Sequence, residues 1–454
     1  MKIIVVGAGF TGLSAAMELA EAGNEVTILE RDDVIGGLAG AFDVGGQKLE
    51  KFYHHWFTND VYVQRMVERL GKSAEVVCRE THTGMYYANN FFRLSSPLDV
   101  LRFTPLSFWN RVRLGMSVLA VRRVKNWREL ESTTAIEWLR SMCGEEVFKV
   151  VWEPLLVGKF GEYSPDVSAV WFWNKLKLRG SSRNSGGHET LLYYRGGFAA
   201  LAEQMADQAR KHGTKIFLGT SATGLVVENG AVRGVLTSGS SFQADAVLLT
   251  TPLPHAADLL SGHVDSEYEA SLRRIRYLSN ICLVLELDRS LSSTYWLNVN
   301  DPSFPFVGVI EHTNFEPKEN YAGRHIVYLS KYLSPNNLLY RMSDEEILNY
   351  SVPYLRRLFP QFDQSWITGW HVWRADFSQP VVEAHYSKLI PDVVTPIKNV
   401  YLATMAQVYP EDRGTNYAIR AGLQSAAQIM KGNSEDTQTH VKEMHKHGFE
   451  HDAT

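Results

Sequence analysis

A glycine-rich turn within the first thirty residues constrains the fold of this chain more than any other feature. Residues 3–6 are apolar and β-branched, as in a buried parallel strand, and Gly7, Gly9 and Gly12 follow as G-x-G-x-x-G. Apolar residues at helical spacing continue to residue 20, and residues 25–30 read as a second strand that ends on Glu30. This order of elements predicts a βαβ unit that binds a dinucleotide.

Each position of the turn has its own physical role. Gly7 permits the tight turn, Gly9 lets the backbone approach a pyrophosphate, and Gly12 lets the helix pack closely on the strand. The helix N-terminus presents free N–H groups and the positive end of its dipole to the phosphates. Glu30 is placed to accept hydrogen bonds from ribose hydroxyls, and its charge disfavours a 2′-phosphate, so NADP is not expected here.

The residues after Glu30 indicate which dinucleotide binds. Arg31 follows directly, and Gly36, Gly37 and Leu38 come shortly after it. This segment resembles the extended motif of the superfamily of flavin amine oxidases, phytoene desaturases and protoporphyrinogen oxidases, in which a glycine pair passes close to the flavin. The resemblance implies that FAD is the cofactor. Leu38 stands where the family often has an arginine, so any contact made by that arginine is absent.

Two later blocks extend the resemblance over most of the chain. Residues 194–198, with the hairpin signal Asn229-Gly230 further on, resemble the second half of the FAD domain, where the backbone near Ala222 would touch the adenine. Residues 399–422 resemble its last part, in which a helix N-terminus stabilises negative charge on the flavin. The resemblance assigns cofactor contacts in this block to Thr404, Met405, Gly414, Asn416, Tyr417 and Ala418.

The last block departs from the family pattern at two places. Thr404-Met405 replaces a Gly-Asp or Gly-Glu pair, so the acid that binds the ribitol or pyrophosphate is missing. Gly414 stands where amine oxidases place one tyrosine of an aromatic cage, which argues against simple amine oxidation.

Three residues are candidates for catalysis. His54 and His55 lie in an aromatic segment shortly after the glycine pair, and a similar histidine-rich loop occurs in UDP-galactopyranose mutases. Either histidine can steer a proton or contact the flavin; the alternative is one buried structural histidine and one at the surface. No third ligand has fitting spacing, so we predict no metal site. Arg413 is a candidate contact for an anionic group, with Glu411 or Asp412 as a base, unless an internal Asp–Arg pair merely holds the turn.

Further side chains are candidates for contact with the substrate. An aromatic group either lines a substrate cavity or forms the core of a strand; it comprises Trp366, Trp370, His371, Trp373 and Arg374. Lys159 and Arg183 are candidate contacts for an anion.

Residues 98–128 form a basic amphipathic stretch. They contain seven basic residues and one acid, Asp99, interleaved with Trp, Phe and Leu side chains. This pattern suits helices that lie in a membrane interface, helices that cover the substrate domain, or a basic mouth that collects phosphorylated substrates.

Composition bounds the remaining possibilities. The net charge of −4 gives no reason to expect nucleic-acid binding. The three cysteines are far apart and fit a reducing compartment, and the N-terminal residues read as a strand rather than a signal core. We therefore expect a cytoplasmic enzyme, with peripheral contact at the inner face of the membrane as a further possibility. After residue 432 the chain is polar, and we expect a solvated tail rather than a metal site from its histidines, His440, His445, His447 and His451.

These observations predict an α/β protein with a Rossmann-like, glutathione-reductase-type FAD-binding domain and a discontinuous α+β substrate domain. The FAD-binding domain is expected to comprise residues 1–80, 194–260 and 395–432, the substrate domain residues 81–193 and 261–394, and the tail residues 433–454.

The leading functional hypothesis is an FAD-dependent oxidoreductase or desaturase that takes a hydride from a largely apolar, lipid-linked or isoprenoid substrate to flavin N5. Oxygen, a quinone or another acceptor would reoxidise the flavin. Two alternatives stay open: a flavin-dependent nucleotide-sugar isomerase resembling UDP-galactopyranose mutase, and a non-catalytic flavoprotein partner. The oligomeric state is not predicted.

Overall fold

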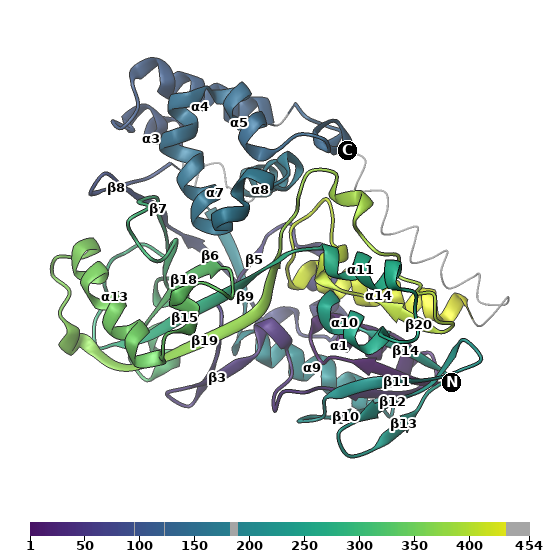
Figure 1. Ribbon diagram of the computed structural model, residues 1–454. Coiled ribbons are helices and arrows are strands. Elements are labelled where there is room, and N and C mark those ends of the chain that lie inside the picture. The colour runs from purple at the N-terminus through teal and green to yellow at the C-terminus, as the bar shows by residue number, and fades with distance from the viewer. Residues whose placement is uncertain (95, 122, 182–188, 433–454) are drawn as a thin grey trace.

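The computed structural model describes residues 1–94, 96–121, 123–181 and 189–432. Figure 1 shows helices at the top of the view, a long sheet at the lower left, and a second, helix-covered sheet at the lower right. Arg183 and the four histidines of the tail lie outside the described residues. No helix in the described part of the chain combines the length and the apolar character that a membrane-spanning segment needs.

Among the described residues, a sheet of five parallel strands carries the glycine turn. Its order is β10-β2-β1-β14-β20. The strands are β1 (Lys2–Val6), β2 (Glu25–Leu29), β10 (Lys215–Phe217), β14 (Ala246–Leu249) and β20 (Val400–Leu402). Ile3 and Val5 are buried on one face of the sheet and Ile4 and Val6 on the other. Both faces are covered, which explains the continuous apolar run of β1.

Helices cover one face of this sheet, and a smaller sheet covers the other. On the first face α1 packs against both α9 and α14. On the second, the antiparallel strands β11-β12-β13 and helix α10 complete the core. The bounds are α1 (Phe10–Glu21), α9 (Gly197–Lys211), α14 (Thr415–Lys431), β11 (Ala222–Glu228), β12 (Ala231–Thr237), β13 (Ser241–Gln243), α10 (Leu253–Leu260) and α11 (Ser266–Arg274). Widely separated stretches of chain thus supply this one unit, and the predicted α/β fold class is confirmed.

The close crossing of α1 and α14 depends on Gly422. A Cβ atom at this position would overlap the Ser14 hydroxyl and the Thr11 carbonyl oxygen of α1. We expect Gly422→Ala to lower the free energy of unfolding by about 2 kcal/mol, because overpacking a rigid interface forces backbone shifts. Urea unfolding followed by circular dichroism measures this. Gly239→Ala, in a turn where a Cβ meets no atom within 4 Å, is the control, and equal stability of the two variants would contradict the prediction.

The long sheet has the order β19-β15-β18-β17-β16-β7-β8 within the described residues, and only its β16–β7 pair is parallel. Alternate residues of β15 face opposite ways: Cys282 and Val284 join the core around α1, whereas Leu283 and Leu285 pack toward α13. The bounds are β7 (Thr83–Tyr87), β8 (Asn90–Phe92), β15 (Tyr277–Leu287), β16 (Trp296–Val299), β17 (Gly308–Glu311), β18 (His325–Leu333), α12 (Leu338–Arg341), α13 (Asp344–Leu358) and β19 (Ile367–Pro380). One face of this sheet therefore borders the glycine-turn unit.

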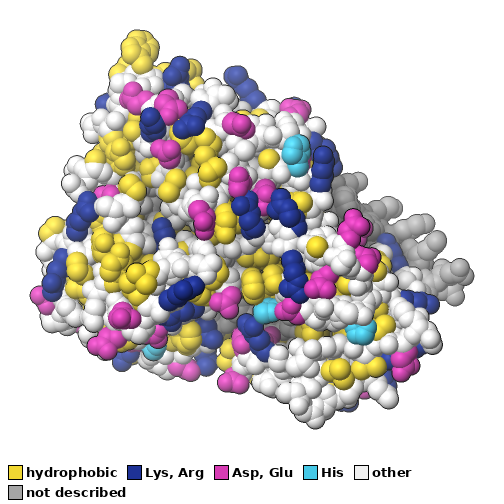
Figure 2. Space-filling model, viewed as in Figure 1, with side chains coloured by type: hydrophobic (Ala, Val, Ile, Leu, Met, Phe, Trp, Pro, Cys, Tyr) yellow, Lys and Arg dark blue, Asp and Glu magenta, His cyan; other side chains and the backbone are white. Residues whose placement is uncertain are grey.

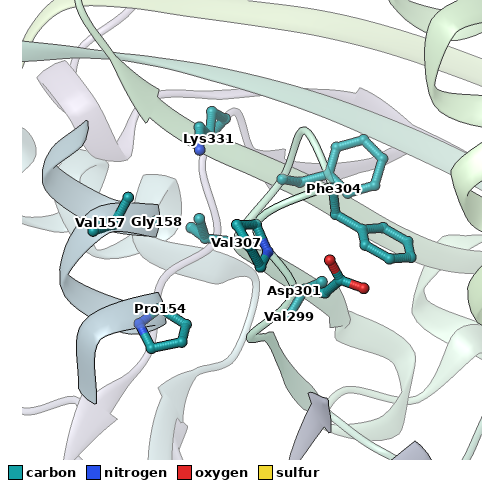
Figure 3. Close-up of a pocket in the computed structure, with 10 residues that line it drawn as sticks. Pro154, Val157, Gly158, Val299, Asp301, Phe304, Val307 and Lys331 are labelled. Atoms are coloured by element: carbon teal, nitrogen blue, oxygen red, sulfur yellow. The ribbon is translucent and has the colours of Figure 1, made fainter. Parts of the chain in front are cut away.

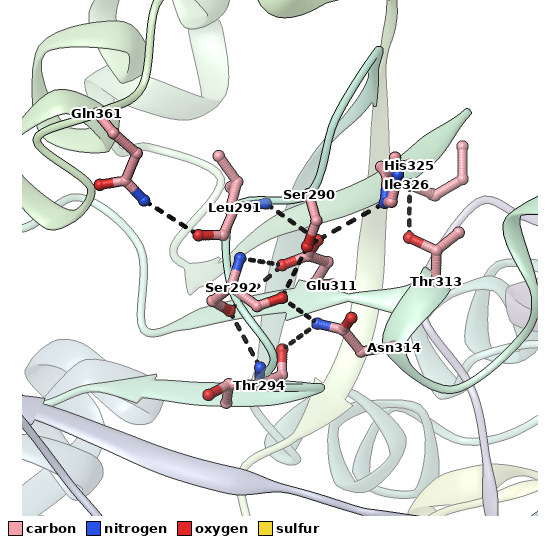
Figure 4. A network of polar contacts seen from close by, with 10 residues as sticks. All are labelled: Ser290, Leu291, Ser292, Thr294, Glu311, Thr313, Asn314, His325, Ile326 and Gln361. Carbon is pink, nitrogen blue, oxygen red and sulfur yellow. Dashed lines mark hydrogen bonds and ion pairs between the residues drawn. The ribbon is translucent and has the colours of Figure 1, made fainter. Parts of the chain in front are cut away.

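A buried carboxylate fixes the loop between β15 and β16 (Figure 4). Glu311 accepts hydrogen bonds from the backbone N–H groups of Leu291 and Ser292, at 3.1 and 2.9 Å, and from the Ser290 and Ser292 hydroxyls. The side-chain amide of Asn314 donates hydrogen bonds to two carbonyl groups of the same loop. Burial raises the pKa of Glu311, against the opposing effect of these donors. The loop leads to Tyr295 and Trp296, so this network helps to fix the position of these two aromatic side chains, which contact His55.

The helical region at the top of Figure 1 packs around buried apolar residues that include Leu114, Leu139, Phe148 and Phe172. Its helices are α3 (Pro97–Arg102), α4 (Phe108–Val121), α5 (Ala135–Cys143), α6 (Glu145–Val147), α7 (Glu153–Phe160) and α8 (Ala169–Ser181).

Glu50 ties the segment after Gly36-Gly37 to helix α9. Its buried carboxylate accepts the N–H of Phe198 at 2.6 Å and the hydroxyl of Tyr193 at 2.7 Å. Gly196 and Gly197, with φ of +81° and +82°, form the turn that brings α9 to this carboxylate. The remaining elements of this part are β3 (Ala41–Val44), β4 (Gln47–Glu50), β5 (Trp56–Phe57), α2 (Val61–Arg69), β6 (Val76–Thr81) and β9 (Glu189–Tyr194).

Candidate functional site

The glycine turn has the shape that a pyrophosphate needs. Gly7 has φ of +108°, and a Cβ on Gly12 would overlap the carbonyl oxygen of Gly7. No side chain in the described part of the chain caps the N-terminus of α1. The N–H groups of its first turn are therefore available to an anion, and the glycines allow close approach.

Glu30 lies buried at the end of β2, beside this turn. Its carboxylate accepts the N–H of Ala8 at 2.7 Å and the N–H of Asp32 at 2.9 Å. Burial raises its pKa, against the lowering effect of these two backbone donors. The remaining lone pairs of the carboxylate suit ribose hydroxyls. Arg31, by contrast, is exposed and pairs with Asp32 at 3.4 Å.

The second glycine pair touches the first turn directly. Gly36 and Gly37 have φ of +108° and +59°, and Gly36 forms a parallel bridge with Gly9. A Cβ on Gly37 would lie 3.3 Å from the Cα of Gly9. Any side chain larger than hydrogen would thus push the two loops apart. Glycine is therefore required where the two loops meet. Leu38 follows, half-buried.

Ala222 lies near the end of β2 that carries Glu30. The chain before it is held to the end of β2, because the N–H of Thr220 donates to the carbonyl of Glu30 at 2.7 Å. Ala222 begins β11 two residues later and is half-buried. This position agrees with the contact that the resemblance implies, which stays a prediction.

Thr404 carries a buried hydroxyl that lies in a capping box with Gln407 and donates no hydrogen bond among the described residues. It follows β20 and is almost fully buried. Its N–H donates to the Gln407 side chain at 2.8 Å. A buried hydroxyl that donates no hydrogen bond is costly, so a polar group of a cofactor fits here in place of the family acid. Met405 beside it is half-buried. The residues of the glycine turn, Glu30 and Thr404 together fit FAD.

The four predicted cofactor contacts at the N-terminus of α14 differ in their surroundings. A Cβ on Gly414 would meet no atom within 4 Å, so space is open beside it. Asn416 instead uses its side-chain oxygen to cap α2, accepting the N–H groups of Tyr62 and Val63 at 2.8 and 3.1 Å. The Tyr417 ring lies 4.8 Å from the Arg420 guanidinium, and the N–H of Ala418 already donates to Gly414. Of these four residues, Gly414 is therefore the one with open space beside it.

The two candidate histidines have different surroundings. His54 Nδ1 lies 2.5 Å from the carbonyl of Phe52, which can only accept, so Nδ1 carries the proton and Nε2 the lone pair. Burial lowers the pKa of His54 to about 4, the Phe52 carbonyl opposes this, and the Arg413 charge adds to the lowering. His55 lies 3.0 Å from the Tyr295 hydroxyl and edge-on to the Trp296 ring. The fold thus brings His54 within reach of the Arg413 charge and His55 to the Tyr295 hydroxyl.

Asp412 and Arg413 form the centre of a charged group that joins four parts of the fold. The carboxylate of Asp412 accepts the Trp171 indole N–H at 3.0 Å and lies 2.5 Å from Lys175 Nζ and 3.9 Å from Lys159 Nζ. Arg413 donates to the Tyr332 hydroxyl at 2.9 Å and to the Gln379 side chain at 3.1 Å. We call this group the Asp412 cluster; its members are Lys159, Trp171, Lys175, Tyr332, Gln379, Asp412 and Arg413.

The charge of the cluster holds Asp412 ionised. Burial opposes ionisation, but the cations Lys175, Lys159 and Arg413 outweigh it and keep the pKa of Asp412 well below its usual range. Glu411, the other candidate base, is engaged by Arg420 through two hydrogen bonds of 2.8 and 2.9 Å. Neither acid is therefore a ready proton acceptor.

Sequence analysis missed four members of this cluster. Trp171 and Lys175 lie on α8 at i, i+4 spacing, which places them on one helix face and was the available signal. Tyr332 and Gln379 come from β18 and β19, and only the pairing of distant strands brings them to Arg413.

The predicted aromatic group on β19 does not form one wall. Trp373 and His371 pack on Phe42, at ring distances of 5.0 and 4.6 Å. Trp370 packs instead into the core beneath α13, and Trp366 lies against Arg289. Arg374 pairs with Asp344. These positions match the alternative of strand-core aromatics.

A pocket lies on the other side of the long sheet (Figure 3). α7 contributes Pro154 to it, the loop after β16 contributes Phe304, and β18 contributes Lys331. It contains about 350 Å³ of space that opens to solvent. Lys331 and Tyr332 are consecutive in a strand and so point to opposite faces. The pocket is therefore separate from the Asp412 cluster.

Comparisons with known proteins place this geometry in context. The model of the flavin containing amine oxidoreductase family matches residues 10–430. A zeta-carotene desaturase of Synechocystis sp. is 22% identical over 97% of this chain and 99% of its own length. A 15-cis-phytoene desaturase of Glycine max is 24% identical over 89% of this chain and 75% of its own length. The structure of a reduced UDP-galactopyranose mutase superposes with a TM-score of 0.73 at 16% identity, covering 96% of each chain.

Proposed function

This chain belongs to the flavin-containing amine oxidoreductase family and is an FAD-dependent oxidoreductase, and from this we propose that it removes a hydride from a largely apolar, isoprenoid-like substrate. The observation that carries the proposal is the open side of Gly414 at the N-terminus of α14, directly after Arg413, whose charge reaches the half-buried His54. The names of the two curated relatives, a carotene and a phytoene desaturase, support an apolar substrate.

The residues of this chain would divide the work as follows. The glycine turn, Glu30 and Thr404 would hold FAD, whose bound form accepts a hydride at N5. The N-terminal dipole of α14 would stabilise the negative charge that develops nearby. Desaturation also releases a proton, and neutral His54, with its Nε2 lone pair, is the candidate acceptor. The aromatic rings of Tyr53 and Tyr332 would exclude water.

A second candidate function has one observation in its favour. The Asp412 cluster concentrates cations around the segment that precedes Gly414, which suits a sugar diphosphate, and the fold is shared with a UDP-galactopyranose mutase. Isomerisation by such an enzyme causes no net oxidation. The family assignment to an oxidoreductase gives the non-catalytic alternative no support.

Product analysis tests the proposal. FAD-loaded protein incubated with phytoene micelles or with geranylgeraniol, and a soluble quinone, is expected to yield a product that lacks two hydrogen atoms. Conversion of UDP-galactopyranose to its furanose form only after dithionite reduction, without oxidation of either isoprenoid, would contradict it and favour the isomerase.

We further propose that α3 and α4 contact a membrane. Their exposed apolar side chains gather where Figure 2 shows hydrophobic atoms at the top of the molecule, over the helical region. They include Leu98, Leu101, Phe108, Trp109, Met116 and Leu119, of which Trp109 is 78% exposed. Arg102, Arg113 and Arg123 are exposed in the same stretch and suit anionic headgroups.

The double variant Phe108→Ser, Trp109→Ser is expected to lower binding to phosphatidylglycerol-containing vesicles roughly tenfold or more, because two large apolar side chains no longer enter the interface. Vesicle co-sedimentation measures this. Leu338→Ser is the matched control, since Leu338 is 72% exposed on α12, away from this stretch. An equal loss in the control, or no loss in the double variant, would contradict membrane contact through these helices.

A further inference from the structure

The pocket of Figure 3 combines apolar walls with one lysine. It lies between α7, the loop after β16 and strand β18. Its walls are mostly apolar and include Pro154, Val157 and Phe304. Two charged residues, Asp301 and Lys331, also line it. An apolar pocket with one or two polar groups is the usual form of a site for a small molecule.

Lys331 brings a positive charge to the pocket that the described part of the chain does not compensate. No acid and no hydrogen-bond acceptor among the described residues engages its ammonium group. The side chain is partly buried, and this burial lowers the pKa of Lys331. Figure 3 shows its nitrogen directed toward Val157 and Val307. A partly buried cation without a partner is costly, so an anion that enters the pocket would relieve this cost.

The acid in the pocket already has its own partners. The carboxylate of Asp301 accepts a hydrogen bond from the Arg357 guanidinium at 2.8 Å, and from the N–H and hydroxyl groups of Ser303 at 2.9 and 2.6 Å. The Asp301–Arg357 pair is neutral as a unit, so Lys331 leaves one net positive charge. One ammonium group suits a carboxylate, whereas a phosphate offers three strong acceptor oxygens and more charge.

The pocket has room for a small ligand. It contains about 350 Å³ of space that opens to solvent, near the lower end of the range for small-molecule sites, roughly 300–1,000 Å³. Its α7 wall is close to the loop, since a Cβ on Gly158 would lie 2.6 Å from the Val307 side chain. Val157, on the same helix, is 42% exposed and therefore marks the open side.

We propose that this pocket binds a short apolar carboxylate, with its carboxylate paired to Lys331 and its hydrocarbon part against Val157, Phe304 and Val307. The site is separate from the hydride-transfer site, because Lys331 and Tyr332 point to opposite faces of β18. The inference does not rest on the proposed function.

Two probes that differ only in their polar end test the inference. Octanoate and octanol have the same chain length, and their binding to the FAD-loaded protein at pH 7 can be measured by calorimetry or by ligand-observed NMR. We expect octanoate to bind at least about fivefold more tightly than octanol, because only octanoate pairs with Lys331. The flavin absorbance should stay unchanged during both titrations.

Two variants separate the charge from the pocket. Lys331→Met should remove the preference for octanoate and retain binding of octanol, because the pocket stays and the charge is lost. Val157→Trp should weaken binding of both probes, because the larger side chain fills the open side of the pocket. Circular dichroism shows that each variant folds.

Lys318→Met is the matched control. Lys318 is exposed and lies in the short turn before β18, outside the pocket. The variant removes the same charge from the protein as Lys331→Met does. It should bind both probes as the unaltered protein does.

Four results would overturn the inference. Equal affinity for octanoate and octanol would remove the need for a cation, and acetate bound as tightly as octanoate would remove the need for an apolar pocket. Unchanged octanoate binding in both Lys331→Met and Val157→Trp would place the probe elsewhere. A change in flavin absorbance, with displacement of octanoate by phytoene, would place the probe at the hydride-transfer site. None of these readouts depends on turnover, so failure of the proposed oxidation would leave the pocket proposal standing.

Discussion

Gly12→Ala is expected to abolish stable FAD binding. The added Cβ would overlap the Gly7 carbonyl oxygen and lie 3.2 Å from the Val5 side chain. Neither β1 nor the start of α1 can move away, because both are part of the buried core. The turn must therefore open, and the phosphate-binding N–H groups lose their alignment. We expect the FAD affinity to fall about a hundredfold, equivalent to about 3 kcal/mol.

The flavin-to-protein ratio after gel filtration measures this effect. Circular dichroism of the apoprotein shows whether the variant folds, since a fold lost altogether would remove FAD for another reason. Gly115→Ala is the matched control: this glycine lies within α4, and a Cβ there meets no atom within 4 Å. A Gly12→Ala protein that retains stoichiometric FAD would show that the cofactor does not rest on this turn.

Asp412→Asn is expected to destabilise the protein by about 3 kcal/mol. Removal of one partner of a buried charge group leaves the others uncompensated. Asparagine keeps the shape and an acceptor for the Trp171 indole, but Lys159, Lys175 and Arg413 lose their anion. The partial exposure of Lys175 reduces the cost, because water then solvates part of its charge.

The pH dependence of this effect has a definite sign. The pKa of Asp412 is held well below its usual range in the folded protein. Its stabilising contribution is therefore complete above the pKa of the unfolded chain, about 4, and is lost only as the pH falls toward the folded value. Urea unfolding at pH 5 and pH 7.5 should thus give the same difference between Asp412→Asn and the unaltered protein.

A double-mutant cycle separates lost charge compensation from lost packing. Lys175→Met in the Asp412→Asn background removes one of the uncompensated cations, so the double variant should be less destabilised than the sum of the single variants. Additive effects would mean that the charges do not interact, and would contradict the role given to Asp412.

The cofactor half of the fold could be predicted from sequence because its signals are local. The turn from Gly7 to Gly12, the acid at the end of β2 and the Asn229-Gly230 hairpin each depend on a few neighbouring residues. Their chemistry is set by backbone geometry that only certain residue types allow. The fold class, the family and FAD as cofactor are accordingly confirmed.

The catalytic half depends on contacts between distant segments. The side-chain oxygen of Asn416 caps α2, more than 350 residues earlier, and no local signal in the sequence indicates this contact. His54 and His55 are adjacent in sequence, yet the Arg413 charge reaches His54, whereas His55 contacts Tyr295 and Trp296. Packing between distant segments decides both contacts, and local periodicity carries no information on such packing. The roles of these residues, and the domain boundaries, stay predictions.

The most direct test of the account is an anaerobic titration of the FAD-loaded protein with geranylgeraniol and with phytoene. Substrate oxidation predicts loss of the oxidised flavin band at about 450 nm, with two electrons transferred per flavin and an isoprenoid product that lacks two hydrogen atoms. An unchanged band with both isoprenoids, combined with turnover of a UDP-sugar by the chemically reduced enzyme, would contradict hydride removal as the reaction of this protein.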